Sequence, residues 1–212
     1  MEVIYITDYR DSKERILITA EDVFAQKGLA GARVNDIAAK ARVNKRMLYH
    51  YFGSKEGLYE AVLRVNLEKV YSIEDKLSSL NSVIERITGA IRQYFYFLAE
   101  NPNFVRIMEW EFLQGSEHLS KLFSRYDIYN LPEVASVLKE GINEGIFHAD
   151  IDSRHLMLSI NAMCFMYFNR AGALGAVWEG DMLSPEMLEE RLRHILQVVF
   201  RAILKEPGAC DF

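Results

Sequence analysis

Apolar residues recur at three- and four-residue spacing along most of the chain, which is the periodicity of helices that bury one face. A first helix is predicted from Asp11, a capping residue, to Gly28, a residue typical of helix C-termini. Its apolar stripe consists of Ile16, Leu17, Ala20, Val23 and Phe24. This spacing predicts an amphipathic helix of about four turns.

Short helices are predicted next. The second covers about 34–41, the third follows the capping residue Asn44, and the fourth follows Ser54. Longer helices are predicted at 83–100, 103–114, 117–144 with an interruption near 130–132, 153–170 after the capping residue Asp152, and 185–204. Gly172, Gly175 and Gly180 indicate a loose connection before the last helix. Because no alternating strand pattern longer than a few residues is present, the predicted class is all-α.

Composition narrows the classes of protein. The chain has 212 residues, 50% hydrophobic and 12% aromatic, which excludes a disordered chain. Two cysteines, Cys164 and Cys210, are typical of a reducing compartment. The longest apolar run, 162–168, falls short of the ~18 residues of a membrane-spanning helix, and the first residues do not form a signal peptide. We therefore expect a soluble cytoplasmic protein.

The charge is distributed unevenly, although the net charge is −5. Residues 1–57 hold ten basic and eight acidic side chains, whereas residues 58–212 hold fifteen and twenty-two. The segment 33–55 alone holds six basic residues and one acid. Such a cluster fits a polyanionic partner, and it also fits a solvated helix face with chance clustering of charge.

The second and third helices are too short to be stable alone, so another helix, such as the first, must hold them. A pair of short helices joined by a tight turn, with a basic second member, is typical of a helix-turn-helix whose second helix enters the DNA major groove. An αα-hairpin without any DNA role has the same geometry. Helix lengths alone do not decide between the two.

The residues of this segment carry a more specific motif, which reads Ile37-Ala38-x-x-Ala41-x-Val43-x-x-x-x-Leu48-Tyr49-His50-Tyr51-Phe52-x-Ser54-Lys55-Glu56-x-Leu58. Upstream, Arg15, Ile16, Leu17, Ala20, Phe24 and Lys27-Gly28 belong to the same pattern. Over residues 12–60 the chain closely resembles the DNA-binding domain of the TetR family of bacterial transcriptional regulators. The resemblance implies a DNA-binding domain at 1–57 with its helix-turn-helix at about 33–52, a connecting helix at 58–76, and a ligand-binding and dimerisation domain at 77–212.

Candidate DNA-contacting residues follow from their place in this motif. They are Arg33, Arg42, Asn44, Lys45, Arg46, Met47, Tyr49, His50 and Lys55. Arg46 suits a bidentate contact to guanine and Met47 an apolar contact to a thymine methyl. The resemblance implies that Tyr49 contacts a phosphate, and His50 and Lys55 are also expected to contact the DNA backbone.

Three of these positions depart from the family pattern. Arg33 stands where a capping threonine is usual, Arg42 replaces a turn glycine, and Asn44 replaces a common serine. A positive φ is uncommon for arginine, so the turn at Arg42 is expected to be strained or different.

The second half holds more apolar bulk than a thin helical bundle needs, with polar residues interrupting the stripes. A small-molecule site would have this composition, and so would an ordinary core. Candidate ligand-binding residues are Phe104, Met108, Trp110, Phe112, Asn161, Cys164, Tyr167 and Phe168. The last helix carries a broad stripe expected to face a second copy, formed by Leu192, Ile195, Leu196, Val199 and Ile203.

One cluster has the residue types of a metal site, namely His148, Asp150, Asp152 and His155. Carboxylates at a helix start explain it without a metal, so neither a metal nor a cofactor is expected. The predicted function is a repressor that binds a palindromic operator as a homodimer and releases it when an unidentified small molecule binds. The alternatives are an activator of the same fold, a helical protein-interaction module, and an enzyme with an added DNA-binding domain, for which no catalytic constellation is found.

Overall fold

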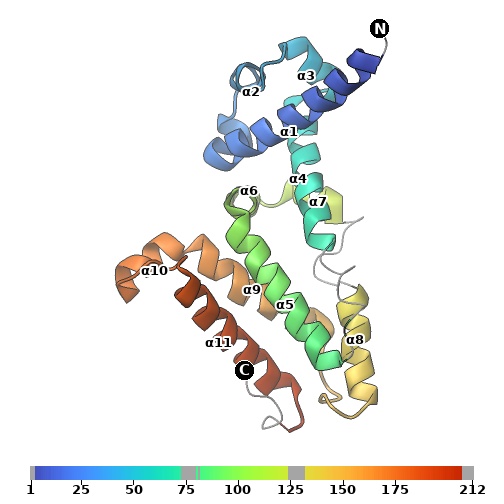
Figure 1. Cartoon of the computed structure of the whole chain (residues 1–212), viewed down its shortest axis with the longest axis vertical. Coiled ribbons are helices and arrows are strands. Elements are labelled where there is room, and N and C mark those ends of the chain that lie inside the picture. Colours follow the sequence, from blue (N-terminus) through green and yellow to red (C-terminus); the bar gives the residue numbers. More distant parts are fainter. Residues whose placement is uncertain (1–2, 73–79, 81, 124–131, 207–212) are drawn as a thin grey trace. The chain divides into compact units, whose positions relative to one another are not determined.

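The computed structural model describes residues 3–72, 80, 82–123 and 132–206. Within these ranges the chain forms the helices α1 to α11 and one isolated antiparallel bridge, between Phe147 and Leu204 (Figure 1). The predicted all-α class is confirmed. The chain divides into two compact units, Met1–Glu68 with Asn103–Tyr126, and Lys69–Pro102 with Asp127–Phe212.

The first unit is built around the packing of α1 against α2, α3 and α4. Its helices are α1 (Val3–Gly31), α2 (Val34–Lys40), α3 (Lys45–Phe52), α4 (Lys55–Tyr71), α6 (Pro102–Leu113) and α7 (Glu117–Phe123). Four residues of the predicted stripe of α1 are buried and Leu17 is half-buried. Among the buried ones, Phe24 makes an edge-to-face contact with Tyr59 of α4 at 4.9 Å between ring centroids. Ile37 and Leu48 are fully buried, which fixes α2 and α3 against this core.

Helix α1 differs from its prediction at one end and agrees at the other. It begins at Val3 instead of Asp11, because residues 3–10 contain neither proline nor glycine to stop a helix. At the C-terminal end the helical geometry breaks at Gly28, as predicted, with φ 63° and ψ 177°. The last turn, from Gly28 to Gly31, is thus set apart from the rest of α1.

Helices α6 and α7 belong to the first unit by their contacts, whereas the family resemblance implies that residues 77–212 form a ligand-binding and dimerisation domain. The side chains that tie this segment to α1 and α4 are Trp110, which bonds to Ala25 O, and His118, which contacts Glu60. Helix periodicity identifies a buried face but not the helices that cover it.

The second unit is centred on α5, which packs against α8, α9 and α11 (Figure 1). Its helices are α5 (Val83–Glu100), α8 (Pro132–Asn143), α9 (Ser153–Asn169), α10 (Ala171–Trp178) and α11 (Pro185–Ile203). Ser82 and Glu85 form a capping box on α5, and Asp152 and Ser184 cap α9 and α11 as predicted. Two residues of the break expected at 130–132, namely 130 and 131, lie outside the described residues, and Pro132 is the first residue of α8.

Helix α10 corrects the expectation of a loose connection. Gly172 and Gly175 lie inside this helix, whose alanine and leucine residues have high helix propensity. A Cβ on Gly175 would lie 2.8 Å from the Gly180 carbonyl oxygen, so the close return of the chain after α10 requires a glycine there. Among the described helices, none combines the length and the apolar character needed to cross a membrane.

Candidate nucleic-acid interface

The turn between α2 and α3 is a complete Schellman motif with an arginine at its left-handed position. Val43 N–H donates to Ala38 O at 3.0 Å, and Arg42 N–H donates to Ala39 O at 3.2 Å. Arg42 has φ 54°, a region that side chains other than glycine and asparagine rarely occupy. The expected departure at Arg42 is therefore present, and it sets the angle between the two helices.

The start of α3 is fixed by Asn44. Its Oδ1 accepts a hydrogen bond from Arg46 N–H at 2.6 Å, so the predicted N-cap is confirmed. Helix α2 begins directly after Arg33, whose side chain makes no capping hydrogen bond and is exposed.

Helix α3 has one buried and one exposed side. Leu48 is fully buried, and Tyr51 and Phe52 are half-buried on the same side. The exposed side chains are Lys45, Arg46, Tyr49 and His50, with Met47 half-buried between them. Positions 45 and 49, and likewise 46 and 50, lie one helical turn apart, so these side chains form one basic and aromatic surface.

Within this surface the Lys45 ammonium lies 5.6 Å from the centre of the Tyr49 ring, a cation–π arrangement. Arg42 and Asn44 are also exposed beside the N-terminus of α3. Seven of the nine predicted DNA-contacting residues are thus exposed, and Met47 and Lys55 are half-buried.

Lys55, the ninth, has a different environment. It is the first residue of α4 and is half-buried, and its ammonium donates to Leu29 O at 2.8 Å and to Ala32 O at 3.3 Å. Leu29 lies in the last turn of α1, and Ala32 lies between α1 and α2. No sequence pattern predicts these contacts, because the partners are backbone carbonyl groups.

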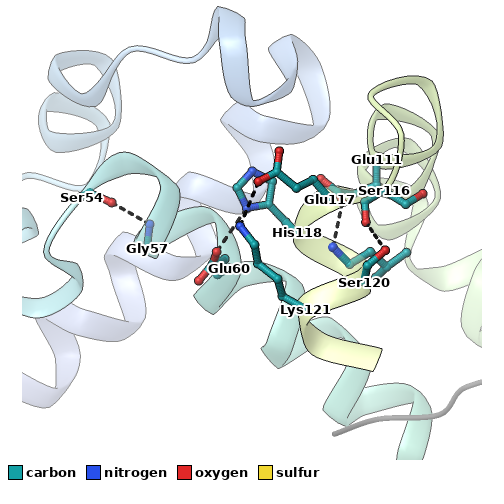
Figure 2. A network of polar contacts seen from close by, with 10 residues as sticks. Ser54, Gly57, Glu60, Glu111, Ser116, Glu117, His118, Ser120 and Lys121 are labelled. Atoms are coloured by element: carbon teal, nitrogen blue, oxygen red, sulfur yellow. Dashed lines mark hydrogen bonds and ion pairs between the residues drawn. The ribbon is translucent and has the colours of Figure 1, made fainter. Parts of the chain in front are cut away.

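A polar network connects α4, α6 and α7 in the first unit (Figure 2). Glu111, only 1% exposed, accepts a hydrogen bond from Leu119 N–H at 3.0 Å and so caps the first turn of α7. His118 Nδ1 lies 3.2 Å from a Glu60 carboxylate oxygen on α4. Burial, and then the charge of Glu111, raise the pKa of Tyr59, whose phenol therefore stays protonated.

Trp110 links α6 to the kink in α1. Its indole N–H donates to Ala25 O at 3.3 Å, and a Cβ on Gly28 would lie 2.9 Å from its ring. The predicted set of ligand-binding residues included Trp110, and its contacts with α1 give it a structural role in the first unit.

The predicted ligand-binding residues are divided between the two units. Phe104 and Met108 are buried and Phe112 is exposed, all on α6 with Trp110. The other four lie on α9 in the second unit; they are Asn161, Cys164, Tyr167 and Phe168.

On α9 these residues contact the core helices of the second unit. Asn161 donates to the Tyr94 hydroxyl of α5 at 2.6 Å, and the Tyr167 hydroxyl donates to Met182 O at 2.6 Å. Cys164 is completely buried, which raises the pKa of its thiol to about 12. An uncharged, unreactive thiol is the result.

The stripe of α11 that was predicted to face a second copy is instead buried within the chain. All five side chains face the interior of the second unit; Leu192, Ile195, Leu196, Val199 and Ile203 are each 3% exposed or less. Side chains that the chain itself covers have no area left for a partner. Among the described residues of this unit, the exposed large apolar side chains are Leu80, Leu158, Met166, Val177, Trp178, Leu183 and Val198.

The cluster around Asp152 behaves as a helix cap. Its carboxylate accepts from the N–H groups of Arg154 and His155 and pairs with the Arg154 guanidinium at 2.8 Å. The Arg154 side chain, together with these backbone donors, lowers the pKa of Asp152. Within the described ranges, no group of three or more metal-ligating side chains is brought together.

Comparison with known proteins gives two family models that match this chain. Residues 16–62 match bacterial regulatory proteins of the tetR family, and residues 84–199 match the tetracyclin repressor-like C-terminal domain. The HTH-type transcriptional repressor NicS of Pseudomonas putida is 26% identical over 198 residues, which cover 91% of this chain and 92% of NicS. The HTH-type transcriptional repressor SCO4008 of Streptomyces coelicolor is 31% identical over 157 residues, or 74% of this chain and 78% of SCO4008.

Solved structures share the fold. The transcriptional regulator FadR from Bacillus subtilis, solved in complex with stearoyl-CoA, aligns with a TM-score of 0.67 at 19% sequence identity. The alignment covers 86% of this chain and 97% of FadR.

Proposed function

Because the chain belongs to the TetR family of bacterial regulatory proteins, we propose that it binds a palindromic operator as a homodimer and releases it when a small molecule binds. Membership of this family establishes the general function of the protein. The protein is a DNA-binding transcriptional regulator and not an enzyme.

The observation that carries the proposal is the construction of α2 and α3. A Schellman turn and the Asn44 cap hold the two helices at a fixed angle, and the fully buried Leu48 side chain packs α3 against the core of the first unit. This leaves Lys45 and Arg46 exposed on the first turn of α3, where recognition helices contact base edges.

Each exposed residue has a proposed role. Arg46 contacts guanine and Met47 contacts a thymine methyl group. The remaining contacts are to phosphates and fix the register on the duplex; they come from Arg33, Arg42, Lys45, Tyr49 and His50. Asn44 orients α3 through its capping hydrogen bond.

The effector is proposed to bind in the second unit, among α5, α9 and α11. Polar side chains that interrupt this apolar core support the location, namely Asn161 bonded to Tyr94, and Tyr96 bonded to Glu189 at 3.0 Å. FadR, which shares the fold, was solved with a small molecule bound. Of the predicted ligand-binding residues, the proposal retains Asn161, Cys164, Tyr167 and Phe168.

The dimer surface is proposed on the exposed sides of α9, α10 and α11. Leu158, Met166 and Val198 are between 40% and 58% exposed, and Val177 and Trp178 of α10 are 74% and 53% exposed. A cluster of exposed large apolar side chains in one unit is typical of an interaction surface. A two-fold dimer also matches the symmetry of a palindromic operator.

Repression is proposed because NicS and SCO4008 are both repressors. An activator would use the same DNA surface and differ only in where the operator lies relative to the promoter. The alternative of a protein-interaction module requires that the protein shows no salt-dependent affinity for DNA.

Selection from a library of random-sequence duplexes tests the proposal. We expect an inverted repeat to be enriched, with half-sites about 34–36 Å apart. Arg46→Ala should lose about 1–3 kcal/mol of discrimination at one position of each half-site. Arg64→Ala removes an exposed arginine of α4 and serves as the control, which should enrich the same sequence as the wild type. Failure of the wild type to enrich any sequence would contradict the proposed function.

A further inference from the structure

The ammonium group of Lys55 is engaged within the first unit. Its two hydrogen bonds, to Leu29 O at 2.8 Å and to Ala32 O at 3.3 Å, bridge 26 and 23 residues of sequence. The side chain is half-buried, whereas Lys45 on α3 is exposed. An ammonium group has three N–H donors, of which two are used here.

These carbonyls are strong acceptors for a physical reason. The last carbonyl groups of a helix lack intrahelical donors, and the C-terminus of a helix carries partial negative charge. Leu29 lies in the last turn of α1, and Ala32 follows its end. Lys55 therefore caps α1 from another helix and places a positive charge where the helix dipole favours one.

The position of this cap matters for α2. Ala32 directly precedes Arg33, the N-cap of α2, so the Lys55 ammonium connects the start of α4 to the point where α2 begins. Trp110 bonds to Ala25 O on the other side of the Gly28 kink. The segment that aims α2 is thus held from α4 and from α6.

We propose that Lys55 is a positioning residue, which fixes the α1–α2 junction and through it the angle at which α2 and α3 meet DNA, and that it is not a phosphate ligand. The proposal rests on the DNA-binding function proposed above. It differs from the expectation based on sequence, which had Lys55 contact the phosphate backbone of DNA.

The two roles predict different results in the free protein. A positioning residue acts without DNA, so Lys55→Met should increase amide hydrogen exchange at Asp36 and Ile37, whose N–H groups donate to Arg33 O at the start of α2, with no DNA present. A phosphate ligand leaves exchange in the free protein unchanged. Lys55→Arg, which keeps the charge and the donors, should restore slow exchange.

The two roles also predict different salt dependence. Loss of one phosphate contact lowers the slope of log affinity against log salt concentration by about 0.9 on duplex DNA. With a short duplex of arbitrary sequence, Lys55→Met should keep the wild-type slope. Lys45→Met, on the exposed side of α3, is the matched control and should lower the slope by about 0.9 per protomer without changing exchange in α2.

The outcomes separate the two proposals. Unchanged exchange in α2 together with a reduced salt slope for Lys55→Met would overturn the positioning role and leave DNA binding intact. No salt-dependent DNA binding by the wild type would contradict the proposed function, while the exchange measurement still tests the role of Lys55 in the fold. If Lys55→Met does not fold, Lys55→Gln, which keeps one donor group, replaces it in both measurements.

Discussion

Arg42 shows how one residue can serve two requirements that conflict. The turn needs a left-handed residue, which costs a side chain such as arginine roughly 1–2 kcal/mol. Glycine would adopt this conformation without strain. The DNA contact proposed for Arg42 would account for an exposed arginine at this point, because its positive charge lies beside the N-terminus of α3.

We therefore expect Arg42→Gly to stabilise the fold and to weaken DNA binding. Relief of the left-handed strain exceeds the roughly 0.4–1 kcal/mol of extra chain entropy that glycine adds to the unfolded state, so the free energy of unfolding should rise by about 0.5–1 kcal/mol. Urea denaturation of the full chain measures it. Arg42→Ala is the control, because it removes the charge and keeps the strain; a stabilisation of the same size in Arg42→Ala would contradict the explanation.

At this scale the sequence predicts what depends on neighbours in the chain. The Asn44 cap, the break at Gly28 and the positive φ at Arg42 were all predictable, since each follows from local backbone geometry. The burial of Glu111 was not, because its hydrogen bond to Leu119 depends on how α7 folds back on α6.

At the scale of helices, the stripe of α11 shows the limit of periodicity. Its apolar residues were correctly predicted to be buried, but the covering element was misjudged, because the same stripe would form against a partner or against α5 and α9. Helix α10 shows a second limit. Three glycines predicted a connection, whereas the intervening apolar residues and the packing of α10 on α9 support a helix.

The kink of α1 gives a test at this scale. Gly28→Ala adds a Cβ at φ 63°, and this atom would lie 2.9 Å from the Trp110 ring. Strain and overlap act together, so we expect the free energy of unfolding to fall by about 2–3 kcal/mol, measured by urea denaturation.

A second variant separates the two causes. The double variant Gly28→Ala, Trp110→Ala removes the overlap and leaves the backbone strain. Gly28→Ala should therefore lower the free energy of unfolding by less when it is added to Trp110→Ala than when it is made in the wild type. If the free-energy losses of the two single variants simply add up in the double variant, Trp110 does not pack on the kink.

For the whole molecule, the exposed apolar residues of the second unit predict how it dimerises. Leu158→Glu on α9 and Val198→Glu on α11 place a carboxylate on the proposed dimer surface, where an unpaired buried charge costs on the order of 3–5 kcal/mol. We expect both variants to sediment as folded monomers at concentrations where the wild type is a dimer.

Two controls make this result specific. Leu113→Glu changes an apolar residue of the first unit that is 74% exposed, and it should remain dimeric. Leu196→Glu changes a residue that is 3% exposed, so it should unfold the second unit and not merely dissociate a dimer. A wild type that sediments as a monomer at micromolar concentration would contradict the dimer itself.

Control by a ligand requires that the two units be coupled. Within the described residues, the chain passes between them at Glu68–Lys69, inside α4, and at Pro102–Asn103, at the start of α6. These two helices are also the ones that hold the α1–α2 junction, through Lys55 and Trp110. A change in the second unit that moves either helix therefore acts on the segment that aims α2.

The coupling has a consequence that binding measurements can test. A compound that lowers operator affinity does so only by the amount by which it prefers the DNA-free state, typically about 1–3 kcal/mol, or 5–150-fold. Linkage then requires operator DNA to weaken binding of that compound by the same factor. We expect a compound found by thermal-shift screening to bind more weakly by calorimetry when the selected operator is present, whereas a duplex of scrambled sequence should leave its affinity unchanged. Equal affinity with and without the operator would show that the two units are not coupled.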